Sequence, residues 1–205
     1  MPDSPPRYEF RVWDHDLLGL KRALEALGIH ERSVASTELY LLSRTTDDCN
    51  AKIRAGVLEV KQLLSETRGL QQWQPVLKAP FPLEAPAIVA GLAGLKAATL
   101  PLTRAAYTVS EFLDEVVAPS RILTPVSISK QREVFRIDGY GAEFAAVTIP
   151  SRPVMTVRHT VAIESIDADG LLELAARLDL RRYPNRSYIQ ELKRLMRLST
   201  PAPAR

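Results

Sequence analysis

Charged and apolar residues alternate along several short segments of this chain. In NAKIRAGVLEVK (50–61), Lys52 and Arg54 fall on one side of a first strand, and Glu59 and Lys61 fall on one side of a second. Because successive side chains of a strand point to opposite faces of a sheet, each strand has a charged face and an apolar face. The glycine between the two strands indicates a hairpin turn.

The same alternation occurs in strands that lie far from this hairpin in the sequence. On any single strand, the pattern is typical of a sheet with one face in water. The chain also contains amphipathic helices, which need an apolar surface to cover. If these helices pack on the apolar face of the sheet, the charged face turns inward and lines a basic interior. The further residues that share a charged face are Arg7, Glu9, Arg11, Lys130, Arg132, Arg136, Arg158 and Glu164.

Short turns separate most of the expected strands, which favours antiparallel pairing. Roughly eight strands of this kind can close into a barrel, which leaves no exposed edge. We therefore predict an α+β fold, an antiparallel eight-stranded β-barrel with amphipathic helices packed outside. Strands are expected at about 7–13, 36–43, 52–54, 58–64, 71–77, 122–137, 142–149 and 155–166.

Helix start and stop signals flank the strand segments. Asp14 is a candidate N-cap for a helix with a leucine stripe, and Gly28 is its expected end. A later helix is expected to begin at Asp167 or Asp169, and a final one at Asn185.

The middle of the chain differs from both ends because prolines interrupt it repeatedly. Two helical patterns, at about 86–98 and 109–117, lie between these prolines. We interpret the segment at about 79–121 as a helical insertion within a single domain that covers 1–198. Residues 199–205 (STPAPAR) are expected to be a disordered tail.

Composition excludes several classes of protein. The 205 residues carry a formal net charge of only +3, which argues against nucleic acid as a partner. The single cysteine, Cys49, allows neither an internal disulfide nor a thiolate metal cluster. The longest apolar stretch, near 87–95, is too short to span a bilayer, and the polar, proline-rich first residues do not resemble a secretory signal. A cytoplasmic protein without a membrane partner is the expectation.

The order of these segments resembles the CYTH domain of the triphosphate tunnel metalloenzymes. The matching pieces are YEFRVW with the helix after it, STELYLL, AKIRAGVLEVKQL, SKQREVF, TVAIES and NRSYIQELKRL. This family includes thiamine, inorganic and RNA triphosphatases and one class of adenylate cyclases. The resemblance implies an eight-stranded barrel that binds a triphosphate, with basic side chains on the phosphates and glutamates on Mg²⁺ or Mn²⁺ as candidate cofactors.

The resemblance also implies roles for individual positions. Lys52 and Arg54 resemble the basic pair of the third strand, and Lys130 and Arg132 resemble a later basic pair. Glu164 resembles the last acid of a glutamate pair on the final strand. The phosphate-binding candidates are Arg11, Lys52, Arg54, Lys61, Lys130, Arg132 and Arg158, and the metal-ligand candidates are Glu9, Glu59 and Glu164.

The chain departs from the family pattern on two strands. The first-strand signature Glu-x-Glu-x-Lys reads Glu9, Arg11 and Trp13 here, and the final acid pair reads Ala162 and Glu164. Arg11 and Ala162 each stand where the pattern has a carboxylate, and Trp13 stands where it has the lysine. Arg11 also places a positive charge where a metal ion is expected, which repels the ion. Glu143 is a candidate substitute acid, with a facing that the nearby glycines leave open.

Three functions are therefore weighed. The first is a tunnel protein that binds a triphosphate-containing or other polyanionic ligand, with weak or absent hydrolysis. The second is an active metal-dependent triphosphatase. The third is a non-catalytic module that uses the barrel as a scaffold and the helical insertion as its interface with a protein partner or a second copy of the chain. Tyr188 and His159 are interpreted as structural residues rather than ligands or catalysts.

Overall fold

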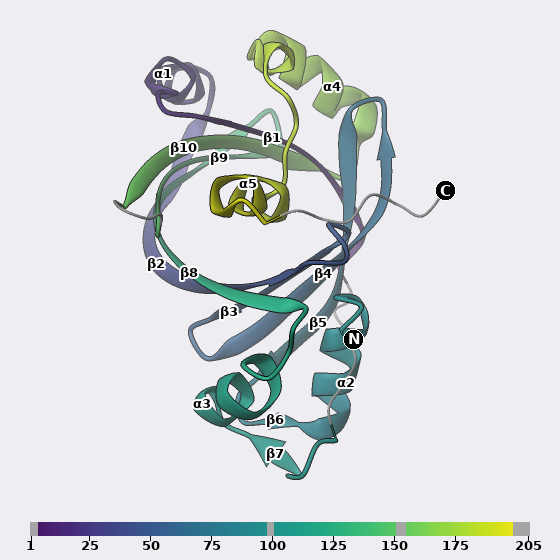
Figure 1. Ribbon diagram of the computed structural model, residues 1–205. Helices are drawn as coiled ribbons and strands as arrows, with labels where there is room; N and C mark the ends of the chain where they lie inside the picture. The colour runs from purple at the N-terminus through teal and green to yellow at the C-terminus, as the bar shows by residue number, and fades with distance from the viewer. Residues whose placement is uncertain (1–3, 98–100, 151–154, 199–205) are drawn as a thin grey trace.

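A computed structural model describes residues 4–97, 101–150 and 155–198 of the chain. Within these ranges, eight antiparallel strands close into a barrel in the order β1-β10-β9-β8-β2-β3-β4-β5, with β5 paired to β1 (Figure 1). The predicted fold class is confirmed. The strands are β1 (Arg7–Asp14), β2 (Ile29–Ser43), β3 (Cys49–Arg54), β4 (Val57–Thr67), β5 (Leu70–Pro80), β8 (Leu123–Ile137), β9 (Tyr140–Ile149) and β10 (Thr156–Ser165).

Strand β2 begins earlier than the sequence predicted, at Ile29 rather than at 36. The side chains of 29–33 are exposed, so this part of the strand has no apolar alternation that would reveal it. Backbone pairing with the equally long β8 holds it in place, from Ile29 opposite Arg136 to Ser43 opposite Leu123.

Helices α1 (Leu18–Leu27) and α4 (Ala168–Arg177) lie side by side on the outer face of the barrel, over β1, β9 and β10 (Figure 1). Leu24 of α1 and Leu171 of α4 are fully buried there in one apolar cluster. Asp167 caps α4, as predicted, by accepting from two backbone N–H groups of its first turn. The N-cap position of α1 falls on Leu17 rather than on Asp14, whose carboxylate accepts from the His15 N–H.

The chain between β5 and β8 packs on a different part of the outer face. It contains β6 (Leu83–Glu84), α2 (Ala85–Ala93), β7 (Ala106–Tyr107), α3 (Val109–Phe112) and the π-helix η1 (Leu113–Val117). Their buried side chains join the outward-facing residues of β3 and β4 in a second apolar cluster. This cluster explains why the apolar faces of the NAKIRAGVLEVK hairpin turn outward.

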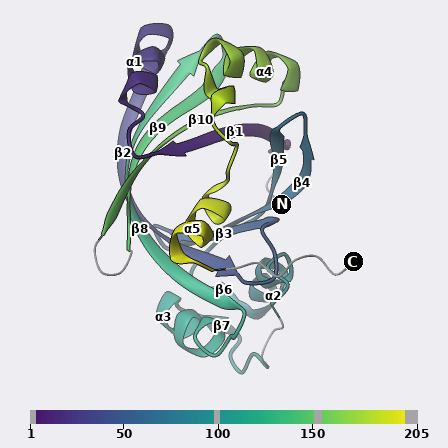
Figure 2. The same cartoon turned by 45° about the horizontal axis from the view of Figure 1, so that its top comes forward.

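One helix differs from the expected packing outside the barrel. After the short 3-10 helix η2 (Leu180–Arg182), α5 (Tyr188–Met196) lies within the ring of strands (Figures 1 and 2). Its N-cap is Ser187, in a capping box with Gln190, rather than Asn185. Asn185 instead accepts from the Arg11 backbone N–H at 2.8 Å, which ties the start of α5 to β1.

None of the helices in the described ranges is long and apolar enough to cross a membrane. The expected tail at 199–205 lies outside the described residues.

Candidate functional site

The interior of the barrel is divided into two halves along its axis. One half is apolar and is filled by α5, whose Ile189 and Leu192 are fully buried. Tyr188 at the start of α5 packs edge-on against Trp13 and stacks on Tyr40. The strand residues that complete this apolar half are Trp13, Tyr40, Leu42, Val126, Ile128, Ala145, Val147 and Ile149.

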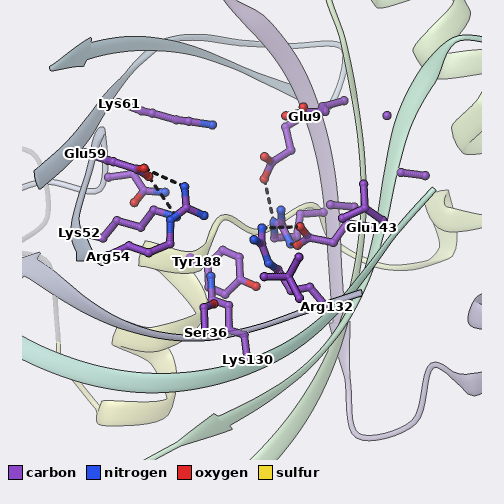
Figure 3. Close-up of a pocket in the computed structure, with 18 of the residues that line it drawn as sticks. Glu9, Ser36, Lys52, Arg54, Glu59, Lys61, Lys130, Arg132, Glu143 and Tyr188 are labelled. Atoms are coloured by element: carbon purple, nitrogen blue, oxygen red, sulfur yellow. Dashed lines mark hydrogen bonds and ion pairs between the residues drawn. The ribbon is translucent and has the colours of Figure 1, made fainter. Parts of the chain in front are cut away.

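The other half is a polar cavity of about 750 Å³ (Figure 3). On β1, β8 and β9, the change from apolar to polar occurs along the same inward face, for example from Ile128 to Lys130 on β8. Among the described residues that line the cavity, the basic ones are Arg7, Arg11, Arg32, Lys52, Arg54, Lys61, Lys130, Arg132 and Arg136, and the acidic ones are Glu9, Glu31, Glu59, Glu143 and Glu164.

A buried ion-pair network occupies one wall, and its central residue is Glu38 of β2. Glu38 has no exposed surface, and its Oε2 atom accepts from Lys130 Nζ at 2.7 Å and from Lys52 Nζ at 3.1 Å. Lys130 Nζ also donates to the Tyr40 hydroxyl at 2.8 Å and lies 3.6 Å from the centre of the Tyr188 ring. These contacts surround Nζ, so the end of the Lys130 side chain is held in one position.

The pKa values of Glu38 and Lys130 are both lowered in this network, for different physical reasons. Burial opposes the charge on Glu38, but Lys130 and Lys52 outweigh it and hold the pKa of this carboxyl well below its ordinary value. Burial lowers the pKa of Lys130 to about 7, with the neighbouring charge of Lys52 acting in the same direction and Glu38 opposing it.

The rim side of this wall is formed by the hairpin of β3 and β4. Arg54 Nη2 donates to Glu59 Oε1 at 2.7 Å, and Lys52 Nζ lies 3.6 Å from Glu59 Oε2. Burial lowers the pKa of Lys52, and the adjacent Arg54 contributes to the shift. The charged side chains of Lys52, Arg54 and Glu59 in NAKIRAGVLEVK therefore contact one another on the cavity side of the hairpin instead of facing bulk water.

On the opposite wall, Arg11 lies between two carboxylates. Its Nε atom is 2.8 Å from Glu9 Oε1, and its Nη1 atom is 3.3 Å from Glu143 Oε1. The same Nη1 atom lies 3.3 Å from the Thr160 hydroxyl. Arg132 Nη1 is 3.2 Å from the second oxygen of Glu143. Glu143, whose facing the sequence left open, thus points into the cavity.

Both carboxyl groups beside Arg11 are held in the ionised form. Burial disfavours the charge on Glu9, but Arg11 and Lys61 outweigh it and lower the pKa of Glu9. Burial is likewise outweighed at Glu143, where Arg11 and Lys130 lower the pKa.

The acids that the family resemblance nominated as metal ligands already have cationic partners. Glu59 is bound by Arg54, as described, and Glu9 is bound by Arg11. Glu164 Oε1 accepts from Arg7 Nη1 at 2.7 Å near the rim. Across the described residues, no group of three His, Cys, Asp or Glu side chains is placed to hold a metal ion. Since a divalent ion needs several oxygen ligands that are free of competing cations, these residues do not fit a metal site.

The remaining predicted site residues separate into two groups. Lys61 lines the cavity opposite Arg132 (Figure 3), and none of the described carboxylates forms an ion pair with it. Arg158 is not among the residues that line the cavity. Its guanidinium contacts His15, which directly follows the last residue of β1. His159 Nδ1 accepts from the Leu17 N–H, in agreement with a structural histidine.

Sequence reasoning missed several residues of this site, among them Glu31, Arg32, Glu38 and the cavity-facing side of Tyr188. Glu38 alternates with Ser36 and Tyr40 in STELYLL, so the two-residue period already placed it on an inward face. Tyr188 was interpreted as packing only, although it also lines the cavity. A helix inside the barrel is a tertiary feature, which the helical period of α5 does not reveal.

Comparison with known proteins supports the fold. No protein-family model and no curated protein matches the sequence. The solved structure of HpAC1 from Hippeastrum, for which a dominant triphosphatase activity is described, aligns with a TM-score of 0.55 over 92% of this chain and 95% of that chain, at 11% identity. A conserved hypothetical protein from Pyrococcus furiosus aligns with a TM-score of 0.53 over 91% and 99% of the two chains, at 17% identity.

The PH1012 protein from Pyrococcus horikoshii OT3 aligns with a TM-score of 0.50 over 93% of this chain and 99% of that chain, at 14% identity. The alignments cover nearly all of these proteins, so the likeness extends over the whole barrel and its helices. The resemblance inferred from the strand motifs is therefore confirmed at the level of the fold, and the chain has the antiparallel eight-stranded tunnel fold of the CYTH-like proteins.

Proposed function

We propose that this protein binds a triphosphate-containing or other polyanionic ligand in the barrel cavity, without a metal ion that would drive hydrolysis. The observation that carries the proposal is the position of Arg11, whose guanidinium bridges Glu9 and Glu143 where the family pattern has an acid. A fixed cation there supplies positive charge to the cavity and repels a divalent ion.

The charge balance of the cavity supports an anionic ligand. Nine basic and five acidic side chains line it among the described residues, and the buried Glu38 adds one more negative charge behind the wall. The surplus is positive, and it lies in a partly enclosed space where charges interact more strongly than in water. A cavity of about 750 Å³ is in the size range of small-molecule sites.

The basic residues contribute in two ways. Lys61 and Arg54 have side chains that are only partly buried, and we assign them, with Lys52, Arg132 and Arg11, to direct contact with phosphate oxygens. Lys130 is enclosed by Glu38 and the two tyrosines, so its role is to position this wall and to add charge.

Calorimetric titration with inorganic tripolyphosphate tests the proposal. Wild-type protein is expected to bind, and the Lys61→Ala and Arg54→Ala variants are expected to bind at least about tenfold more weakly, as for a lost charge-assisted hydrogen bond. Arg22→Ala, which removes an exposed charge of α1 on the outer face, is the matched control and is expected to bind like wild type. Absence of binding to wild type would refute the proposal.

A metal-dependent triphosphatase is the second candidate, favoured by the triphosphatase activity described for HpAC1. Release of phosphate from tripolyphosphate in the presence of Mg²⁺ or Mn²⁺ distinguishes it from the first. Under this candidate, Glu164→Gln abolishes release, whereas under the first there is no metal-dependent release to abolish.

The third candidate, a partner-binding module or homodimer, predicts that neither tripolyphosphate binding nor a ligand-induced shift in melting temperature is observed. A cytoplasmic location also stays a prediction.

A further inference from the structure

Part of strand β2 has a neighbouring strand on one side only. β8 pairs with β2 along its whole length. On the other side, β3 pairs only with 38–41, because β3 ends at Arg54, which lies opposite Glu38. Within the described ranges, no strand therefore pairs with 29–37 on that side. Alternate N–H and C=O groups of this stretch point away from β8, toward the space beyond the turn between β3 and β4.

Strand β1 also extends past a neighbour, but another part of the chain covers its free edge. The pairing of β1 with β5 stops at Glu9, so the following residues have β10 on one side only. There the segment before α5 takes the place of a strand. The Arg186 N–H donates to the Arg11 carbonyl at 2.9 Å, and Asn185 Oδ1 accepts from the Arg11 N–H.

Prolines protect two further free edges. The part of β5 that extends past β1 contains Pro75 and Pro80, and the part of β8 that extends past β9 contains Pro125. A proline has no N–H to donate to an additional strand, and natural sheets use it to prevent unwanted pairing at edges. The stretch 29–37 of β2 is longer than either of these edges and contains no proline. Its free edge is therefore open to an added strand.

The usable part of this stretch is 32–37, which we call the free edge of β2. A bulge between His30 and Arg32 interrupts the register with β8, and the register is regular from Arg32 to Thr37. Because strands in globular proteins are typically about five or six residues long, the free edge is long enough to pair with one more strand.

The free edge borders the basic cavity. Arg32, Val34 and Ser36 follow the two-residue period of Glu38, and all three line the cavity. Arg32 is exposed, and its guanidinium has no ion pair or hydrogen bond with any described residue. The edge therefore presents backbone groups on its open side and an unpaired cation on its inward face.

These features define the chemistry of a strand that pairs here. Side chains directly opposite each other on one face of a sheet are in contact, so the inward side chains of an added strand meet Arg32, Val34 and Ser36. A carboxylate is complementary to Arg32, and an aliphatic side chain is complementary to Val34. A second carboxylate, opposite Ser36, lies next to the position of Arg54 at the end of β3.

We propose that the free edge of β2 binds an extended acidic peptide of a partner protein by strand addition, with the acidic side chains pointing into the barrel cavity. Backbone hydrogen bonds to β2 hold such a peptide, and the inward contacts select its side chains. The inference goes beyond polyanion binding, because backbone groups of the protein recognise this partner.

The probe for this site is the acetylated and amidated peptide Thr-Glu-Thr-Val-Thr-Glu-Thr. Its glutamates and its valine share one face, and its order is the same from both ends, so it suits parallel and antiparallel addition. Titration into ¹⁵N-labelled protein is expected to shift the amide NMR signals of 32–37. The same peptide with lysine in place of glutamate is expected to bind at least about tenfold more weakly. If the acidic peptide leaves the signals of 32–37 unchanged, the proposal is refuted.

Methylation of peptide nitrogens separates strand addition from simple charge attraction. One methylated probe carries N-methyl groups on its threonines, and the other carries them on its glutamates and valine. Since successive N–H groups of a strand point to opposite sides, only one of these sets faces β2. We expect one methylated probe to bind at least about tenfold more weakly and the other to bind like the parent peptide. Equal behaviour of the two probes would show that the peptide is not held as a strand.

The variant Arg32→Glu tests the charge on the protein side. Its melting temperature is expected to match that of wild type, because Arg32 has no partner among the described residues. Its affinity for the acidic peptide is expected to fall at least about tenfold. Arg22→Glu, on the outer face of α1, is the control and is expected to bind like wild type. Unchanged affinity in Arg32→Glu would overturn the assignment.

A parallel titration of wild type with tripolyphosphate keeps this inference apart from the proposed function. If tripolyphosphate binds and the peptide does not, strand addition fails and polyanion binding stands. If the peptide binds and tripolyphosphate does not, the proposed function fails and strand addition stands.

Discussion

The ammonium of Lys130 lies 2.7 Å from the carboxylate of Glu38, and solvent reaches almost none of either side chain. Removing one member of such a buried pair leaves an uncompensated charge in the interior. We expect Glu38→Gln to lower the free energy of unfolding by about 3–5 kcal/mol, measured by urea denaturation.

The matched control for this substitution is Glu31→Gln. Glu31 forms an ion pair with Arg136 at the solvent-exposed rim, and such pairs contribute less than about 1 kcal/mol. If Glu38→Gln cost no more than Glu31→Gln, the Glu38 network would not be a stabilising element of the barrel wall.

Acid is expected to destabilise the protein through the cavity carboxylates. The pKa values of Glu9, Glu38 and Glu143 are lower in the folded protein than their ordinary value of 4.5. Below pH 4.5 the unfolded chain binds protons that the folded protein does not, so stability is full above this pH and is lost as the pH falls. Urea denaturation between pH 3 and pH 6 measures the effect.

The same pH series in Glu38→Gln gives the contribution of a single group. Below pH 4.5, the unfolding free energy of this variant is expected to depend less steeply on pH than that of wild type. The difference in slope is at most that of one bound proton, about 1.4 kcal/mol per pH unit. Equal slopes in the two proteins would contradict the lowered pKa of Glu38.

Lys61 and Lys130 are expected to respond differently to removal of their charge. Lys61 has no ion pair with any described residue, so Lys61→Met is expected to weaken tripolyphosphate binding about tenfold without loss of stability. Lys130→Met leaves the buried carboxylate of Glu38 without its nearest cation. This variant is expected to lower both the affinity for tripolyphosphate and the stability of the protein. Parallel calorimetry and thermal melting distinguish the two. A loss of stability in Lys61→Met would mean that it belongs to the structural network.

Replacement of Arg11 by an acid is expected to create a metal requirement. Arg11→Glu removes the cation between Glu9 and Glu143 and gathers three carboxylates at one point of the interior. Their repulsion lowers the melting temperature, and Mn²⁺ is expected to restore it by several degrees through ligand-linked stabilisation. Arg22→Glu, on the outer face of α1, is the control. A shift with Mn²⁺ that is as large in wild type as in Arg11→Glu would show that Arg11 does not exclude the metal.

Much of the fold and of the cavity could be predicted because strands have a strict two-residue period. The two-residue period assigned Arg11, Lys52 and Lys130 to the charged face of their strands. Because the amphipathic helices have to pack on the apolar face, the charged face was predicted to point inward. The division of the interior could not be predicted this way. Trp13 continues the inward face of Arg11, and only the insertion of α5 into the barrel explains why that face becomes apolar.

The sequence pattern also could not predict which charged residues of the cavity form ion pairs. Alternation shows that Glu9 and Arg11 share a face, but the contact of Arg11 with Glu143 joins strands that are distant in the chain. The register between β1, β10 and β9 determines it, and that register depends on the closure of the whole barrel.

The central claim is that side-chain cations hold the ligand without a metal ion. Its most direct test is a calorimetric titration of wild-type protein with tripolyphosphate, performed once in EDTA and once with excess Mg²⁺. The account predicts clear binding in EDTA that Mg²⁺ does not strengthen, because Arg11 already provides the charge between Glu9 and Glu143. Binding that appears only with Mg²⁺ would contradict it.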